Sequence, residues 1–223
     1  MGSNYNPHPA PRNTKRIIKM PRIDDYITAK KLAVEKLAKL SPDRIIQQSG
    51  FAISAAEVID IPFLDRNYRI SYPDFDFVDV SEPNKEVPIQ EQVLILHYLM
   101  ANNPRKLPPK WIAYREINGA AFYFSAFVKR AIDPLKKVFG QNVADLKKAA
   151  GQLNAVPIET GDAGFEFHIF PKVALQMILW IGDDEFPAEA NILFDQTIGG
   201  LLSPEDVAWL AGMVVYRLIT LSR

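Results

Sequence analysis

The spacing of hydrophobic and polar residues divides the chain into helical and extended stretches. From Asp24 onward, apolar residues recur with the period of one helix face. Ser41 and Pro42 stop that helix and start a second one, which Gly50 ends. Further helices are predicted at 88–102, 120–132, 134–140 and 143–153, the last of them capped by Asn142.

Two regions are instead predicted as strands, largely because apolar and polar residues alternate in them with the period of half-buried strands. The first is 51–80, where Pro62 and Pro73 favour sheet edges or bulges because proline cannot donate to a ladder. In the second region, 165–170 alternates strictly, whereas 173–180 is nearly continuous apolar, which is typical of a central strand or a buried helix turn. We assign 173–180 to a strand because a proline precedes it and a Gly-Asp turn at 182–183 joins it to a hairpin partner at 190–195. We expect the two regions to contribute to one sheet.

The C-terminal stretch predicts a buried helix. Ser203, Pro204 and two acids form a strong helix start, and Arg217 is the only charged residue between Val207 and Leu221. The fold class expected is therefore α+β: an antiparallel sheet built from hairpins, packed with several helices and a buried C-terminal helix. We expect residues 1–22 to be a disordered leader and 23–223 to form a single domain.

Composition excludes several chemistries. The chain has no cysteine, so it cannot supply disulfides, thiol nucleophiles or thiolate ligands. It shows neither a secretory signal nor an apolar run long enough to span a membrane, which favours a cytoplasmic protein without membrane contact. There is also no phosphate-binding loop, no nucleophile elbow and no histidine pair at metal-ligand spacing.

Charge is unevenly distributed although the net charge is zero. Residues 105–150 carry ten bases against three acids, whereas 151–206 carry ten acids and Lys172 as the only base. Either these segments lie near each other and neutralise one another, or the surface is polarised and steers a charged partner. Nucleic acid is disfavoured as a partner, because neighbouring acids cancel every basic excess.

Two groups of side chains are candidates for chemistry. Glu166 and His168 should share one sheet face with Phe170, where they form either a proton-transfer pair, a cation site or simply a solvated surface. Arg115 lies among aromatic residues that either line a pocket for a flat ligand, with the guanidinium meeting its carboxylate, or pack in the core. These aromatic residues are Trp111, Tyr114, Phe122, Tyr123, Phe124 and Phe127.

The stretch WIGDDEFPAEANILFD, residues 180–195, contains five acids around one turn. Gly182 and Asp183 suffice for the turn, so Asp184, Glu185 and Asp195 have no turn-forming role. They are either solvated charges and helix caps, or buried carboxylates that need a positive partner. The second reading predicts that an acid of this turn contacts Arg115 or a nearby base.

The order of motifs over residues 111–206 resembles a prokaryotic family, domain of unknown function 3786. WIAYREINGA, Gly161-Asp162, Phe170-Pro171, WIGDDEFP, ILFD and LLSPED carry the resemblance, and W-x-GD-x-EFP with ILFD is its most specific part. Members of the family are described as iron–sulfur or corrinoid-associated proteins, some with a cysteine-rich cluster-binding segment. This chain departs there, so a cluster would have to sit on a partner. The family positions are Gly182, Asp183, Glu185, Phe186, Pro187, Phe194 and Asp195.

Three hypotheses on function remain open. The first is a binding or accessory protein that recognises a cofactor-bearing partner, corrinoid or redox, or a tetrapyrrole-type ligand, through the sheet face and the acidic turn. The second is an enzyme that uses the hairpin carboxylates on a divalent metal or as acid and base. The third is a structural or assembly protein; oligomerisation is left open. The candidate site residues are Trp111, Tyr114, Arg115, Asp162, Glu166, His168, Asp183, Asp184, Glu185, Phe186 and Asp195.

Overall fold

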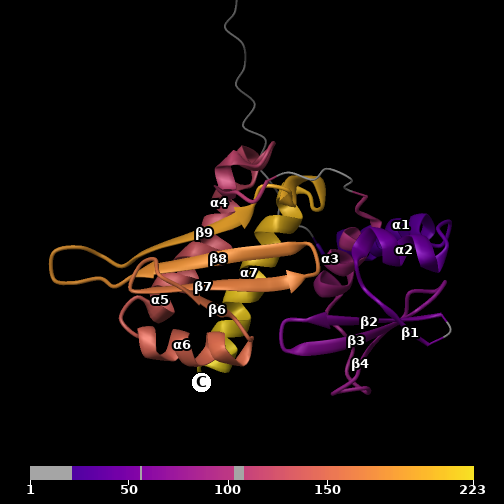
Figure 1. Cartoon of the computed structure of the whole chain (residues 1–223), viewed down its shortest axis with the longest axis horizontal. Helices are drawn as coiled ribbons and strands as arrows, with labels where there is room; N and C mark the ends of the chain where they lie inside the picture. Colours follow the sequence, from indigo (N-terminus) through magenta and orange to yellow (C-terminus); the bar gives the residue numbers. More distant parts are fainter. Residues whose placement is uncertain (1–21, 56, 103–107) are drawn as a thin grey trace, which may run out of the picture.

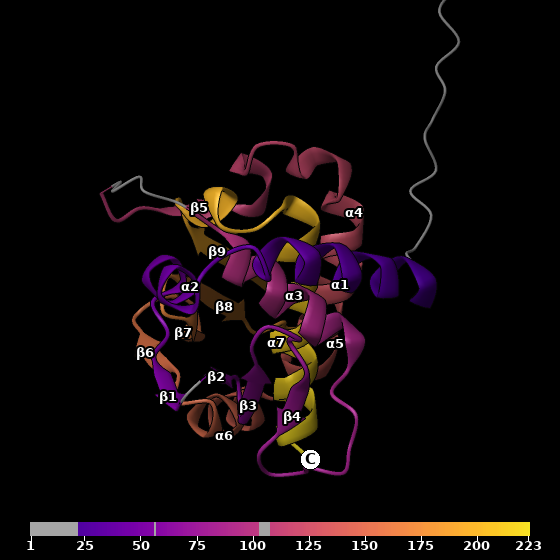
Figure 2. The same cartoon turned by 90° about the vertical axis from the view of Figure 1, so that its right-hand side faces the viewer.

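The computed structural model describes residues 22–55, 57–102 and 108–223. The predicted leader, 1–22, falls outside this range except for Arg22, whose backbone N–H donates to Asp25 in the first helical turn. The rest forms two antiparallel sheets side by side, with helices α3 (Ile89–Met100) and α7 (Pro204–Leu221) between and behind them (Figures 1 and 2). This confirms the α+β class built from hairpins. The assignment of 23–223 to one domain stays a prediction.

Two short helices open the described chain. Helix α1 (Ile23–Leu37) packs on α3 through its buried face, which includes Ala33 and Leu37. Helix α2 (Pro42–Ser49) starts and ends as the sequence predicted, because the Ser41 hydroxyl accepts from the Arg44 N–H and Gly50 forms the C-cap.

The first sheet has the order β1-β2-β3-β4. Pro62 lies opposite Asn67 of β3, while β1 pairs only with Val58 and Ile59, so the other side of Pro62 is open as an edge would be. Pro73 lies in the turn after β3 rather than in a strand. The strand bounds are Ile53–Ala55 (β1), Val58–Phe63 (β2), Arg66–Ser71 (β3) and Phe77–Asp79 (β4).

Between the sheets in sequence comes a helical region of several short pieces. The stretch KLPPK, residues 106–110, predicts a loop, and it lies partly outside the described residues. The predicted helix 120–132 is broken: its last turn, η3, is a π-helical segment that continues into α5. The elements are η1 (Tyr114–Glu116), η2 (Ala120–Phe122), α4 (Phe124–Phe127), η3 (Val128–Ile132), α5 (Asp133–Phe139) and α6 (Val143–Gln152), the last capped by Asn142.

The second sheet has the order β5-β9-β8-β7-β6. The expectation of one sheet for both strand regions was therefore wrong: strands β1 to β4 pair only with one another, and so do strands β5 to β9. Helix α3 lies between the two groups in the sequence. Phe170 also departs from its predicted side, because a register shift between His168 and Phe170 turns its ring inward onto Tyr98. The strands are Trp111–Ala113 (β5), Val156–Ile158 (β6), Ala163–Phe170 (β7), Val173–Trp180 (β8) and Glu189–Asp195 (β9).

The hydrophobic core continues from one sheet to the other. Phe170 of the second sheet stacks on Phe63 of the first and on Tyr98 of α3. Helix α7 begins after the short turn η4 (Ile198–Gly200) and packs on η3, α4, α5 and α6. Leu210, Val214 and Leu218 of this helix are fully buried, which confirms the predicted buried C-terminal helix. No helix of the described residues is long and apolar enough to cross a membrane.

Candidate functional site

The second sheet has one face covered by helices and one face open. The helices α5 and α6 and the segment η3 contact strands β7 and β9 on the covered face, and Figure 1 shows α5 behind the strands. Residues that are paired across neighbouring strands point to the same side of a sheet, so the strand register shows which residues lie on the side away from these helices. We call this side the open face. Its members are Trp111, Ala113, Val156, Ile158, Gly164, Glu166, His168, Ala174, Gln176, Ile178, Trp180, Glu189, Asn191, Leu193 and Asp195.

A polar group lies across the middle strands of the open face. The Nε2 atom of His168 lies 3.0 Å from Oε1 of Glu166, and the Gln176 amide donates to Oε2 of the same carboxylate at 3.0 Å. The side chain of His168 is 65% exposed and that of Glu166 is 23% exposed. The predicted sharing of one face by Glu166 and His168 is therefore confirmed, with the pair open to solvent.

Large apolar side chains share the open face with this polar group. Trp180 is 40% exposed and Val156 is 51% exposed, while Trp111 is half-buried opposite Asp195 on the neighbouring strand. The Oδ1 atom of Asp195 accepts hydrogen bonds from the backbone N–H and the hydroxyl of Thr197, so this carboxylate caps the turn after β9. The open face thus combines indole and aliphatic surface with acids and holds no Lys or Arg.

Beyond the sheet, residues 181–188 form an extended connection that we call the hairpin arm (Figure 1). Asp183 makes its turn: its side chain accepts from the N–H groups of Glu185 and Phe186, and its own N–H donates to the Phe186 carbonyl at 2.8 Å. Gly182 allows the close approach at the base, since a Cβ there would lie 2.5 Å from the Ala188 nitrogen. Asp162 also holds the base of the hairpin arm, because its carboxylate accepts a hydrogen bond from the Ile181 N–H at 2.7 Å.

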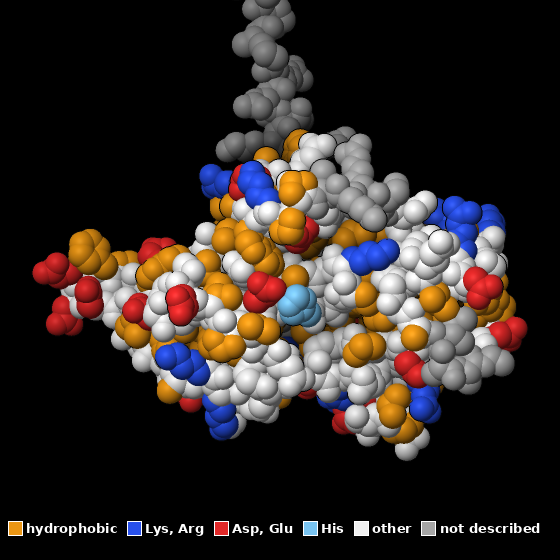
Figure 3. All heavy atoms as spheres, viewed as in Figure 1, with side chains coloured by type: hydrophobic (Ala, Val, Ile, Leu, Met, Phe, Trp, Pro, Cys, Tyr) orange, Lys and Arg blue, Asp and Glu red, His pale blue; other side chains and the backbone are white. Residues whose placement is uncertain are grey.

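The tip of the hairpin arm is a solvated group of acids beside an exposed ring. Asp184 and Glu185 are exposed, and Phe186 is 68% exposed. Figure 3 shows acidic side chains gathered at this tip next to hydrophobic ones. Within the described residues, no ion pair joins Asp183, Asp184 or Glu185 to a base.

The predicted contact between this turn and Arg115 is therefore wrong. The Arg115 guanidinium lies over the Phe124 ring instead, 3.7 Å from its centroid. The physical reason is that Asp183 satisfies the turn through backbone N–H groups and the tip stays in water, so no buried carboxylate needs a cation.

The aromatic residues near Arg115 pack in the core rather than line a slot for a flat ligand. Tyr114 and Phe127 stack with 4.2 Å between ring centroids and 2° between planes, which leaves no room for a third ring. The Tyr114 hydroxyl donates to the Pro204 carbonyl at 2.7 Å, and burial raises the pKa of this phenol. Only Phe122, 74% exposed, projects from this group into solvent.

Local sequence patterns do not predict the ion pairs that join α7 to α3 and to the β2–β3 turn. Arg217 contacts Asp65 and, at 3.1 Å, Glu91, whose other oxygen accepts from the Tyr68 hydroxyl at 2.5 Å. Asp206 likewise joins α7 to α3 by its contact with His97 at 2.9 Å. A lone charge on an otherwise apolar helix was the only available sign, because the partners lie more than one hundred residues away in the chain.

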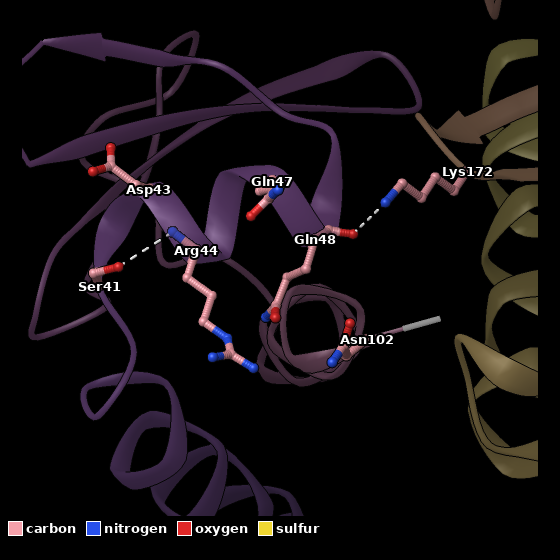
Figure 4. Close-up of a pocket in the computed structure, with 7 residues that line it drawn as sticks. All are labelled: Ser41, Asp43, Arg44, Gln47, Gln48, Asn102 and Lys172. Atoms are coloured by element: carbon pink, nitrogen blue, oxygen red, sulfur yellow. Dashed lines mark hydrogen bonds between the residues drawn. The ribbon is translucent and has the colours of Figure 1, made fainter. Parts of the chain in front are cut away.

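A polar cavity of about 500 Å³ lies where α2 meets the end of α3 and the β7–β8 turn (Figure 4). Lys172 donates to the Gln48 carbonyl there at 2.6 Å, and Arg44 and Asn102 extend into the same space. All of its charged side chains are exposed, so water screens them. The described residues contain no group of three or more His, Asp or Glu side chains that could hold a metal ion.

Comparisons with known proteins identify a family and no function. No curated protein and no solved structure matches the chain. The family model described as Domain of unknown function (DUF3786) matches residues 41–217, which include both sheets, the hairpin arm and most of α7. The chain therefore belongs to the DUF3786 family.

Proposed function

We propose that this protein is a binding or accessory protein that docks a partner protein with a basic surface, through the open face and the hairpin arm. The observation that carries the proposal is the open face itself: a sheet face that no helix of the described part of the chain covers, with half-exposed indole surface beside acids and without a base among its members. Sheet faces of this composition suit protein contacts, since aromatic residues supply most of the binding energy at interfaces.

The charges of this surface favour a basic partner over a second copy of the chain. Glu189 on the open face and Asp184 and Glu185 at the tip have no ion-pair partner among the described residues. Two copies placed face to face would bring these acids together, which costs free energy. A partner with Lys and Arg at matching positions would be attracted from a distance and held in register.

In its finer form the proposal names the partner as a protein that carries a corrinoid or redox cofactor. The resemblance of the sequence motifs to the DUF3786 family is the support for this part. The chain has no cysteine, so a cysteine-ligated cluster would belong to the partner. A tetrapyrrole bound directly to this chain has less support, because the cavity of about 500 Å³ is lined by Ser, Asp, Arg, Gln, Asn and Lys side chains.

Site-specific photo-crosslinking in the native host tests the proposal. A photoreactive amino acid replaces Val156, Trp180 or Phe186 on the proposed surface, and Leu32 or Tyr216 as controls. Val156 and Leu32 are matched, with exposures of 51% and 52%. We expect one and the same protein to be captured from the three test positions and from neither control.

Three outcomes would contradict the proposal: capture of that protein equally from the controls, capture only of a second copy of this chain, or no product from any test position. The finer form has its own readout, the absorbance spectrum of the isolated complex. A crosslinked partner without any corrinoid or redox cofactor overturns the finer form and leaves the docking surface standing.

A further inference from the structure

A second feature, remote from the open face, is a cavity of about 230 Å³ along α7. It lies between one side of α7, the segment η3 and α3, and it is smaller than the roughly 300 Å³ at which pockets for drug-sized ligands begin. Its apolar wall comes from Trp209, Met213 and Tyr216. Its charged side chains are Glu91, Arg130 and Arg217.

Arg130 reaches this cavity from the π-helical segment η3. Such wide turns are rare in proteins and are frequently found at functional sites. Helix α7 comes close to the backbone of Arg130 at Gly212, where an added Cβ would lie 3.3 Å from the Arg130 carbonyl oxygen. The guanidinium then lies over the Trp209 ring, 4.1 Å from its centroid.

Three polar groups in or beside this cavity have no hydrogen-bond partner among the described residues. They are Nη1 of Arg130, Nε1 of Trp209 and the hydroxyl of Tyr26. Tyr26 is 8% exposed, and its ring meets that of Trp209 edge-on with 5.7 Å between centroids. A buried donor without an acceptor costs free energy, and a charged one costs more, so a cluster of three is a strong sign of a missing acceptor.

The nearby carboxylates are engaged elsewhere. Asp206 accepts from the Ser203 hydroxyl and contacts His97, and the hydroxyl of Tyr123 bonds to Glu205. Glu91 is held by Arg217 and Tyr68. No ion pair within 4.0 Å joins Arg130 to an acid of the described residues, so its charge lacks a counterion.

We infer that this cavity binds a small organic monocarboxylate, whose carboxylate is held by Arg130, Trp209 and Tyr26 and whose apolar part lies along Met213 and Tyr216. The three donors are covered by neighbouring atoms in the structure, so binding requires side-chain movement that uncovers them. A single uncompensated cation suits a monoanion. The carboxylate of Glu91 at the far end disfavours a dianion such as phosphate.

Nuclear magnetic resonance of the full-length protein tests the inference, with benzoate as the probe. The chain has three tryptophans, so its indole N–H groups give three resonances, and Trp209→Phe assigns the one that matters. We expect benzoate to bind with a Kd on the order of 1 mM and to shift the Trp209 resonance but not those of Trp111 and Trp180. Benzamide has the same shape without the charge and should produce no such shift.

Arg130→Gln should weaken benzoate binding roughly ten- to hundredfold, the equivalent of one charge-assisted hydrogen bond. Arg115→Gln is the matched control, because Arg115 also lies over an aromatic ring but outside this cavity, and it should leave the affinity unchanged. If Arg130→Gln does not fold, Tyr26→Phe serves instead, since it removes only a hydroxyl, and it should weaken binding several-fold.

The inference is overturned by any of three results. The first is that the Trp209 resonance does not shift at about 20 mM benzoate, a concentration at which a ligand of this affinity saturates the site. The second is that benzamide binds as well as benzoate, and the third is that the Arg130 and Tyr26 variants bind benzoate with unchanged affinity. Binding of inorganic phosphate in place of benzoate would overturn the assignment to a monocarboxylate. None of these results bears on the docking surface, which lies on the other sheet face.

Discussion

Arg217→Met tests the ion-pair network that holds α7 against α3 and the β2–β3 turn. The guanidinium contacts Asp65 and Glu91, and the side chains of Arg217 and Glu91 are 16% and 10% exposed. Methionine keeps the aliphatic packing of the arginine stem but leaves two carboxylates without their cation. Breaking a buried pair costs about 3–5 kcal/mol, and the 25% exposure of Asp65 lets water screen part of the loss. We therefore expect a loss of about 2–3 kcal/mol in the free energy of unfolding.

Arg69→Met is the matched control for this measurement. Arg69 and Asp60 form an ion pair at 3.3 Å on the first sheet, but their side chains are 61% and 43% exposed, so the expected loss is below about 1 kcal/mol. Urea unfolding followed by far-ultraviolet circular dichroism gives both values. In a double-mutant cycle, Glu91→Gln should cost less in the Arg217→Met background than alone. If Arg217→Met loses no more than Arg69→Met, the network does not hold α7 and the reasoning is refuted.

Three further predictions concern the core, the acid limit of stability and cofactors. Leu218 is fully buried, so Leu218→Ala should cost about 2–5 kcal/mol in urea unfolding, and a loss below about 0.5 kcal/mol would show that the helix is exposed. Burial acts to raise the pKa of Asp79, but hydrogen bonds from the Ser81 N–H and from Arg66 lower the pKa overall. The ionised carboxylate therefore stabilises the fold at pH values above its unfolded pKa of about 4, and this stabilisation is lost as the pH falls through the lower folded pKa. Asp79→Asn should accordingly lower the free energy of unfolding at pH 7 and make that free energy fall less steeply below about pH 4. If urea unfolding at a series of pH values shows the same fall for the variant as for the wild type, this prediction is wrong. Anaerobic reconstitution of the purified chain should yield no bound iron–sulfur cluster, and stoichiometric iron with acid-labile sulfide would disprove this.

Local patterns in the sequence were enough to predict most elements of the fold. Ser41 and Ser203 cap their helices as expected, because capping depends on residues within one turn. The hairpin of β8 and β9 was predicted because an apolar stretch, 173–180, is followed by a Gly-Asp turn and a second strand-like stretch. The division into two sheets was missed, since alternation shows that a strand has a buried face but does not show which strands lie beside it.

The candidate site was predicted only where one strand decides the geometry. Glu166 and His168 share a face because they are two residues apart on β7, and the structure places them 3.0 Å apart. The contact of the hairpin arm with Arg115 failed because it required two elements to meet in space. The same reason hid the Arg130 and Trp209 contact, for which the sequence offers no periodic or spacing signal.

The most direct test of the docking surface is the affinity of the crosslinked partner for a charge-reversed protein. Asp184→Lys, Glu185→Lys and Glu189→Lys combined remove three acids that have no ion-pair partner among the described residues, so the fold should persist. Isothermal titration of the purified partner should then show binding at least about tenfold weaker at roughly 0.15 M salt, with the difference shrinking near 1 M. Equal affinity of the wild-type and charge-reversed proteins at low salt would contradict the account.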